Sequence, residues 1–190
     1  ALKIQETQQI ATASVVQYQT NGTIDVGDDF SGLIDHRGQE FSTYDYRGFY
    51  PLYYFGFTKC PDICPAELHK MMAALDQIET NQPDIYRFIK PIFISVDALR
   101  DTPAQIAAYA ENFHPRLLWV TGTHEKLTEA AKGFRIYFSI PDDATPDGEY
   151  NVDHSVFFFL MDRDGKLLSY YGQNKTADEI AVAMSEVVAE

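Results

Sequence analysis

Short apolar runs alternate with segments of helical periodicity along most of this chain, and that alternation constrains the fold more than any other feature. The apolar runs have the length and composition of buried strands, and they cover residues 49–57, 91–97, 117–121, 156–161 and 166–171. Helix-start signals and helical spacing predict helices that begin at Pro65, at Thr102, before Leu127 and at Thr176. Three strand-helix units followed by a hairpin and a closing helix are typical of an α/β fold, a mixed sheet with helices on both faces.

The length and composition of the chain fit one domain with a substantial core. Its 190 residues are 45% hydrophobic and 23% charged, which is close to globular averages. Residues 35–38 predict a turn between two short edge strands. Residues 1–27 are polar and weakly periodic, apart from an alternating stretch at 15–20 that would suit a short strand. We therefore interpret residues 1–27 as an N-terminal extension packed on a domain that spans residues 28–190.

The charge balance excludes some classes of partner. The chain has 28 acidic and 15 basic side chains, a formal net charge of -13 with no block of like charge. This balance argues against binding to nucleic acid or to anionic lipid, which are both negatively charged. No apolar stretch reaches the roughly 18 residues of a membrane span. Because the chain begins at Ala1 without an initiator Met, we expect an upstream signal or anchor in the full-length protein.

The strongest chemical signal is the pair Cys60 and Cys64, the only cysteines of the chain, between a buried strand and a helix. Pro65 has no N–H to donate and disfavours helical geometry at Cys64. We therefore expect residues 60–64 to form a tight loop, with Pro65 as the first helical residue. Both sulfurs then lie near a helix N-terminus, where the helix dipole favours the thiolate.

A cysteine pair with this spacing allows two kinds of chemistry. The sulfurs can close a disulfide, or they can bind one soft metal ion together. A purely structural disulfide is a further alternative, although a bridge that closes so short a loop gains little from restricting the unfolded chain. The residues alone leave redox chemistry and metal binding both open.

The histidines and one acidic cluster are weaker signals. His36, His69, His114 and His124 lie in turns, at helix ends or off the cysteine face of the helix, and we interpret them as solvated surface residues. His154 lies just before a very apolar strand, and its position is as typical of a structural histidine as of a metal ligand. Asp97 and Asp101 flank Arg100 after the second strand, where we expect a local ion pair and a helix start.

Three motifs of the chain together resemble those of the Sco (SenC/PrrC) family of copper-binding proteins. They are FGFTKCPDICP at 55–65, FISVD at 93–97 with RDTP at 100–103, and VDHS at 152–155. The resemblance extends from about Asp28 to about Gly172, and Ala98 departs from the proline that the family often has there. It implies a thioredoxin-like fold in which Cys60, Cys64 and His154 bind copper.

The function implied by this resemblance is that of a copper metallochaperone rather than an enzyme. Such a protein carries Cu(I) or Cu(II) and helps to assemble the binuclear CuA centre of cytochrome c oxidase. The implied partners are subunit II of the oxidase, which holds the CuA site, and other copper chaperones. The implied location is the bacterial periplasm or the mitochondrial intermembrane space, with a membrane anchor in a missing N-terminal segment.

A thiol-disulfide oxidoreductase is the alternative function, with Cys60 and Cys64 as the redox-active pair that reduces the CuA-site cysteines of the oxidase subunit. His154 discriminates between the two, because a dithiol reductase has no need of the imidazole. We expect the strand that His154 opens to run beside the strand that ends at Phe57. We also expect Asp153 to orient the imidazole or a nearby basic group. The loop at 141–150 should be mobile and should keep the imidazole beyond coordination distance until metal arrives.

Overall fold

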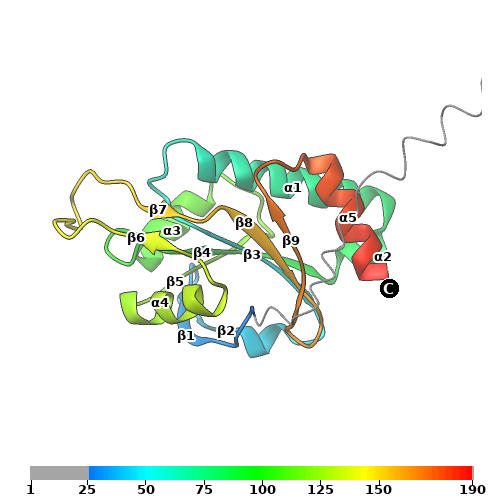
Figure 1. The fold of residues 1–190 in the computed structure, drawn as a ribbon, viewed down its shortest axis with the longest axis horizontal. Helices are drawn as coiled ribbons and strands as arrows, with labels where there is room; N and C mark the ends of the chain where they lie inside the picture. The colour runs from blue at the N-terminus through cyan, green and yellow to red at the C-terminus, as the bar shows by residue number, and fades with distance from the viewer. Residues whose placement is uncertain (1–25, 190) are drawn as a thin grey trace, which may run out of the picture.

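The protein is built around one seven-stranded mixed sheet, which a computed structural model describes over residues 26–189 (Figure 1). The strands lie in the order β2-β1-β5-β4-β3-β8-β9. Their bounds are β1 Ser31–Asp35, β2 Glu40–Ser42, β3 Tyr50–Gly56, β4 Ile89–Ser95, β5 Leu118–Thr121, β8 Phe157–Met161 and β9 Leu167–Gly172. A separate two-stranded ribbon pairs β6 (Phe138–Ser139) with β7 (Asp153–His154).

Five helices and one 3-10 turn complete the described part of the chain. They are η1 Thr43–Tyr46, α1 Ile63–Asn81, α2 Pro83–Tyr86, α3 Pro103–Ala110, α4 His124–Gly133 and α5 Ala177–Ala189. In Figure 1, α1 and α5 lie on one side of the sheet and α4 on the other. None of the helices within residues 26–189 is both long enough and apolar enough to cross a membrane.

The strand directions bring the chemically interesting loops to one edge of the sheet. Strands β3, β4 and β5 are parallel, and the register pairs Gly56 at the end of β3 with Ser95 at the end of β4. The segments that follow these strands, which carry Cys60 and Asp97, therefore leave the sheet side by side. Strand β8 runs antiparallel beside β3, with Tyr54 opposite Phe158, as predicted for the strand that follows His154.

Successive side chains of β3 point to opposite faces of the sheet and build two aromatic layers. Tyr54 packs on Phe93 and Phe158, on the face covered by α1 and α3. Tyr53 and Phe55 pack instead on Phe134, the residue that ends α4. The prediction of a mixed sheet with helices on both faces is confirmed.

Helix α1 begins two residues earlier than the sequence predicts. It starts at Ile63 with Asp62 as its N-cap, so Cys64 is helical and Pro65 is the third helical residue. The first four N–H groups of a helix have no partner within it, so the missing N–H of Pro65 costs no hydrogen bond. The carbonyl of Pro61, with which the proline ring would clash in a longer helix, lies outside the helix. The expectation that Cys64 belongs to a loop before the helix was therefore wrong.

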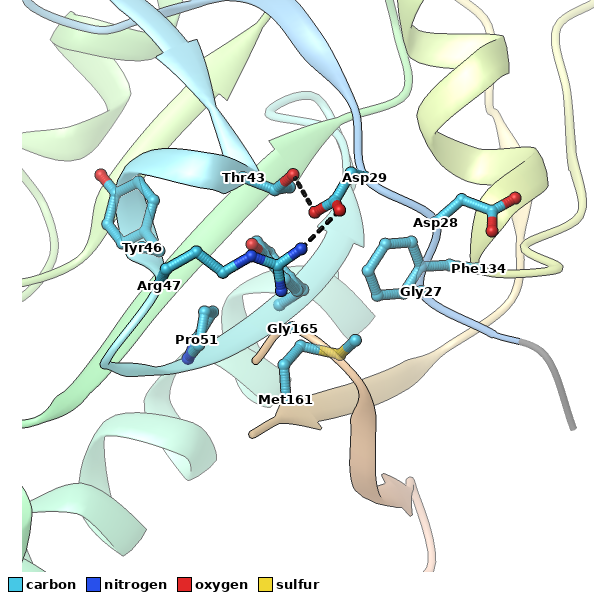
Figure 2. A pocket seen from close by; sticks show the side chains of 11 residues that line it. Gly27, Asp28, Asp29, Thr43, Tyr46, Arg47, Pro51, Phe134, Met161 and Gly165 are labelled. Atoms are coloured by element: carbon cyan, nitrogen blue, oxygen red, sulfur yellow. Dashed lines mark hydrogen bonds and ion pairs between the residues drawn. The ribbon is translucent and has the colours of Figure 1, made fainter. Parts of the chain in front are cut away.

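The described residues before β1 pack on the domain. Gly27 donates its N–H to the carbonyl of Gly133 at 2.8 Å, and Val26 contacts the core. Figure 2 shows Asp29 facing Arg47 and Thr43, with which it forms an ion pair and a hydrogen bond. The short strand predicted at 15–20 lies outside the described residues, and the domain boundary at residue 28 stays a prediction.

Candidate metal centre

The two cysteines lie where β3 passes into α1. Cys64 is in the first turn of α1 and is completely buried, whereas Cys60 precedes the helix and is half-buried. The sulfur of Cys60 accepts a hydrogen bond from the backbone N–H of Cys64 at 3.3 Å. This N–H is one of the free donors at the helix N-terminus, and it stabilises a negative charge on Cys60.

Gly56 makes room for the buried sulfur. A Cβ atom at this position would lie 3.0 Å from Sγ of Cys64 and 2.9 Å from a ring carbon of Tyr54. A side chain there would have to displace the sulfur or the ring, so the close approach of α1 to the end of β3 needs a glycine. An isolated glycine inside an apolar strand is itself a signal of close backbone approach.

His154 reaches the cysteines from β7, ninety residues farther along the chain. Its Nε2 lies 3.4 Å from Sγ of Cys64, and its Nδ1 lies 2.9 Å from the carbonyl oxygen of Ser155. A carbonyl oxygen can only accept a hydrogen bond, so Nδ1 carries the proton in the neutral imidazole. The lone pair of Nε2 therefore faces the sulfur, in the orientation that a metal ligand needs.

Two expectations about His154 were wrong. The imidazole is in contact with Cys64 without a metal, because the pairing of β7 with β6 and of β8 with β3 fixes the chain on both sides of it. It also packs edge-on against Phe57 and Tyr54, with ring centroids 5.7 and 6.3 Å away. Asp153 does not orient the imidazole, because its side chain is exposed and the carbonyl of Ser155 occupies Nδ1.

The two thiols have opposite ionisation. A hydrogen bond from the Cys64 thiol lowers the pKa of Cys60 to about 4, against the effect of burial, and the backbone N–H groups of Cys64 and Asp62 add to the lowering. The same hydrogen bond, together with burial, raises the pKa of Cys64. The pair therefore holds one proton, which lies on Cys64, and Cys60 is a thiolate at neutral pH.

Tyr54 is a site residue that the sequence analysis missed. Burial raises the pKa of its hydroxyl. Its hydroxyl group is buried without a hydrogen-bond partner among the described residues. It lies within a continuous apolar run, and a run of that kind does not reveal which aromatic side chain ends beside a sulfur.

The other histidines stay away from this centre, as predicted, although two of them are not simply solvated. His69 and His124 are exposed. His36 and His114 are half-buried, and their Nδ1 atoms accept hydrogen bonds from the N–H groups of Trp119 and Arg116 at 3.4 and 3.1 Å. Both imidazoles therefore stabilise the local backbone through hydrogen bonds.

The donors are assembled only in part. Over residues 26–189, no three His, Cys, Asp or Glu side chains already stand at the mutual spacing of a complete metal site. Cys64 and His154 are in contact, and Cys60 is linked to Cys64 by hydrogen bonds. With bonds of about 2.3 Å to sulfur and 2.0 Å to nitrogen, donors 3.4 Å apart subtend roughly 105° at one ion. The contact between Cys64 and His154 thus has the spacing at which a sulfur and a nitrogen can share one metal ion.

The fold and the site together define a class of protein. Parallel β3, β4 and β5, an antiparallel β8 beside β3 and two cysteines at the start of α1 form a thioredoxin-like domain, and the imidazole against the sulfur distinguishes it from a plain dithiol site. The chain belongs to the SCO1/SenC family, whose family model matches residues 18–189. This match begins before Asp28 and ends beyond Gly172, the limits predicted for the resemblance.

Individual relatives support this assignment. The chain is 45% identical to "Protein sco1" of Schizosaccharomyces pombe over 166 residues, which cover 87% of this chain and 62% of the relative. It is 43% identical to "Protein SCO1 homolog, mitochondrial" of Homo sapiens over 162 residues, 84% of this chain and 52% of the relative. The chain thus spans less than two thirds of the length of these curated relatives.

Two solved structures are informative about the site. The crystal structure of yeast Sco1 with copper bound matches with a TM-score of 0.81 and 37% identity, over 87% of this chain and 90% of that one. A structure of BsSco, described as having a disulfide switch and as a member of the Sco family of cytochrome c oxidase assembly proteins, matches with a TM-score of 0.68 and 25% identity, over 88% and 96% of the two chains.

Proposed function

We propose that this chain binds one copper ion through Sγ of Cys60, Sγ of Cys64 and Nε2 of His154. The observation that carries the proposal is that Nε2 lies 3.4 Å from the buried sulfur of Cys64, while the hydrogen bond at Nδ1 leaves the lone pair of Nε2 free to bind a metal. A reductase has no use for that arrangement. The copper bound to yeast Sco1, a relative with the same fold, supports it.

The donor set suits copper in both oxidation states. Thiolates are soft ligands and favour Cu(I), for which two sulfurs suffice, while the imidazole adds a nitrogen donor that Cu(II) prefers. Cys60 is already ionised, so only Cys64 has to release a proton when the metal enters. A site with three protein ligands also leaves a position through which a partner's ligands can take the ion over.

The proposed role is copper delivery in the assembly of the CuA centre of cytochrome c oxidase. The description of BsSco as a cytochrome c oxidase assembly protein supports this role, and the name of the human relative supports a mitochondrial setting for such proteins. The proposed partners are subunit II of the oxidase and copper chaperones that load the site. The proposed location is the mitochondrial intermembrane space or the bacterial periplasm.

Copper titration of the reduced protein tests the ligand set. Wild type should bind one copper ion per chain, and Cys60→Ser or Cys64→Ser should lose binding in competition with a Cu(I) chelator, because one thiolate does not hold the ion. His124→Ala, which removes an exposed imidazole outside the site, is the matched control and should bind as wild type does. Full stoichiometry and affinity in either serine variant would rule out the cysteine pair.

A thiol-disulfide oxidoreductase is the second candidate, and the low pKa of Cys60 favours it. A thiolate beside a thiol is the state from which a dithiol attacks a partner's disulfide. The disulfide switch described for BsSco supports the same chemistry. Reduction of an oxidised peptide with two cysteines, followed for wild type and His154→Ala, tests it. Equal rates for the two proteins, together with copper binding that needs His154, would show that reduction needs only the cysteines and that copper binding needs the imidazole as well.

A further inference from the structure

Arg100 connects the end of β4 to the loop that precedes His154. Its side chain is 6% exposed and forms an ion pair with the fully buried Asp97, at 2.6 Å between Nε and Oδ2. Its Nη1 donates to the carbonyl oxygens of Tyr150 and Gly148 at 2.8 and 3.4 Å. The guanidinium also stacks on the ring of Tyr150, 3.5 Å from its centroid, and the Tyr150 hydroxyl donates to Asp97 at 2.7 Å.

These contacts are the polar anchor of an otherwise exposed loop. In the part of the chain that the structure describes, the hydrogen bonds from residues 141–151 to other segments all go to the side chains of Arg100 and Asp97. The remaining ones are turns within the loop, such as Gly148 to Thr145. Figure 1 shows this loop, in yellow, projecting beyond β6 and β7. It leads directly into β7 and His154.

Arg100 and its neighbour Asp101 also contact the segment that leads from β3 to Cys60. The guanidinium of Arg100 lies 5.8 Å from the ring centroid of Phe57, and the imidazole of His154 packs on the same ring. Asp101, the next residue, accepts hydrogen bonds from the backbone N–H and the hydroxyl of Thr58 at 2.9 and 2.5 Å. Thr58 is two residues before Cys60, so the end of β4 contacts both ligand-bearing segments.

We propose that Arg100, held by Asp97, is the positioning residue for His154: it fixes residues 148–150 and the ring of Phe57, and thereby keeps Nε2 directed at Cys64. The effect of Arg100 on copper binding rests on the proposed function, whereas its effect on the placement of the imidazole does not. Arginine is needed because its planar fork bonds a carboxylate and two carbonyls while it stacks on an aromatic ring, which a lysine ammonium cannot do. The interpretation of Asp97 and Arg100 as a local ion pair was therefore correct but incomplete.

Arg100→Lys is the appropriate variant, because it keeps the charge beside buried Asp97 and removes only the fork. Arg116→Lys is the matched control. Arg116 stacks on Tyr86 at 3.7 Å and donates to the carbonyls of Tyr86 and Ile89 at 3.0 and 2.8 Å, so it makes the same stacking and carbonyl contacts, whereas Arg100 pairs with Asp97 as well. Arg116 precedes β5, and its side chain bonds the start of β4, at the end of the sheet away from the site.

The first measurement uses the metal-free protein. Hydrogen exchange of residues 148–155 should be about tenfold faster in Arg100→Lys, and the 15N signals of the His154 ring should move toward those of a mobile imidazole. Arg116→Lys should change neither. Exchange and ring signals in Arg100→Lys that match those of Arg116→Lys would overturn the proposal, whatever the protein binds.

The second measurement adds copper. The dissociation constant for Cu(II) should rise about tenfold or more in Arg100→Lys, with altered Cu(II) spectra, while that for Cu(I) stays within about threefold because the two thiolates remain in place. Equal weakening of both oxidation states would contradict a role through His154. If wild type takes up no copper but Arg100→Lys still frees residues 148–155, the positioning role stands and the proposed function is wrong.

Discussion

At the scale of single residues, the site depends on one proton shared between two thiols. The Cys64 thiol donates to the Cys60 sulfur, which lowers the pKa of Cys60 to about 4 and raises that of Cys64. The contact between Nε2 of His154 and Cys64 places the imidazole next to the protonated sulfur. Copper binding would replace the proton on Cys64. The ion would then lie between the same three side chains that are already in contact without it.

The first prediction concerns the reactivity of Cys60 toward iodoacetamide. A thiol with pKa about 4 is fully ionised between pH 6 and pH 8, so its alkylation rate should be flat over that range. An ordinary cysteine, with pKa near 8.5, gains about tenfold in rate per pH unit there. Mass spectrometry of the modified protein separates Cys60 from buried Cys64, which should react slowly.

Cys64→Ala is the control for this prediction, because it removes the thiol that is the main cause of the lowered pKa. The pKa of Cys60 should rise in this variant, and its alkylation rate should then increase with pH between 6 and 8. A rate in wild type that already rises tenfold per unit would show that Cys60 is an ordinary thiol, and the shared proton would be refuted.

At the scale of elements, the sequence predicts the framework well, because long periodic segments carry it. Thr102 caps α3, with its Oγ1 accepting the N–H of Gln105 at 3.3 Å, and Thr176 and Glu179 bond reciprocally at the start of α5, both as predicted. The short elements α2, β6 and β7 were missed, since two to four residues show no periodicity. The start of α1 was misplaced because a proline is tolerated throughout the first turn.

The site was predictable to the same extent. The resemblance implies Cys60, Cys64 and His154 as ligands, which stays a prediction, and the structure brings His154 against Cys64. The contact itself depends on the pairing of β6 with β7 and on the anchoring of residues 148–150 by Arg100, and both are tertiary contacts. The role of the Ser155 carbonyl is a matter of local geometry that residue types do not reveal.

The second prediction concerns the capping box of α5. Thr176→Ala removes the hydroxyl that accepts the N–H of Glu179, and it should lower the free energy of unfolding by about 1 kcal/mol, or the melting temperature by roughly 2–4 °C. Thr128→Ala is the control, because its hydroxyl only donates to the carbonyl of His124 within α4, and it should change stability by less than about 0.5 kcal/mol. Equal losses in both variants would show that the cap contributes nothing specific.

At the scale of the whole molecule, the proposed copper ion joins segments that are distant in sequence. Cys60 and Cys64 lie between β3 and α1, whereas His154 lies in β7 after the long loop. A ligand that binds only where these segments are assembled must stabilise the complete fold.

The third prediction is that Cu(I) raises the melting temperature of the reduced protein. Free Cu(I) at 100 times its dissociation constant should contribute about 2.7 kcal/mol. A melting curve recorded in a Cu(I) buffer should therefore shift upward by roughly 5–11 °C for a chain of this size. The protein with a Cys60–Cys64 disulfide is the control and should not shift, because its sulfurs are no longer thiolates. A similar shift in the oxidised protein would place the copper elsewhere.

The central claim, that Nε2 of His154 completes a copper site with Cys60 and Cys64, is tested most directly by paired titrations of wild type and His154→Ala with Cu(I) and with Cu(II). The variant should keep its fold and bind Cu(I) nearly as tightly, since two thiolates hold that ion. Its Cu(II) affinity should fall about tenfold or more, and the Cu(II) spectra should change, because the nitrogen donor is lost. Equal Cu(II) affinity and unchanged spectra in the variant would remove His154 from the site and favour the oxidoreductase.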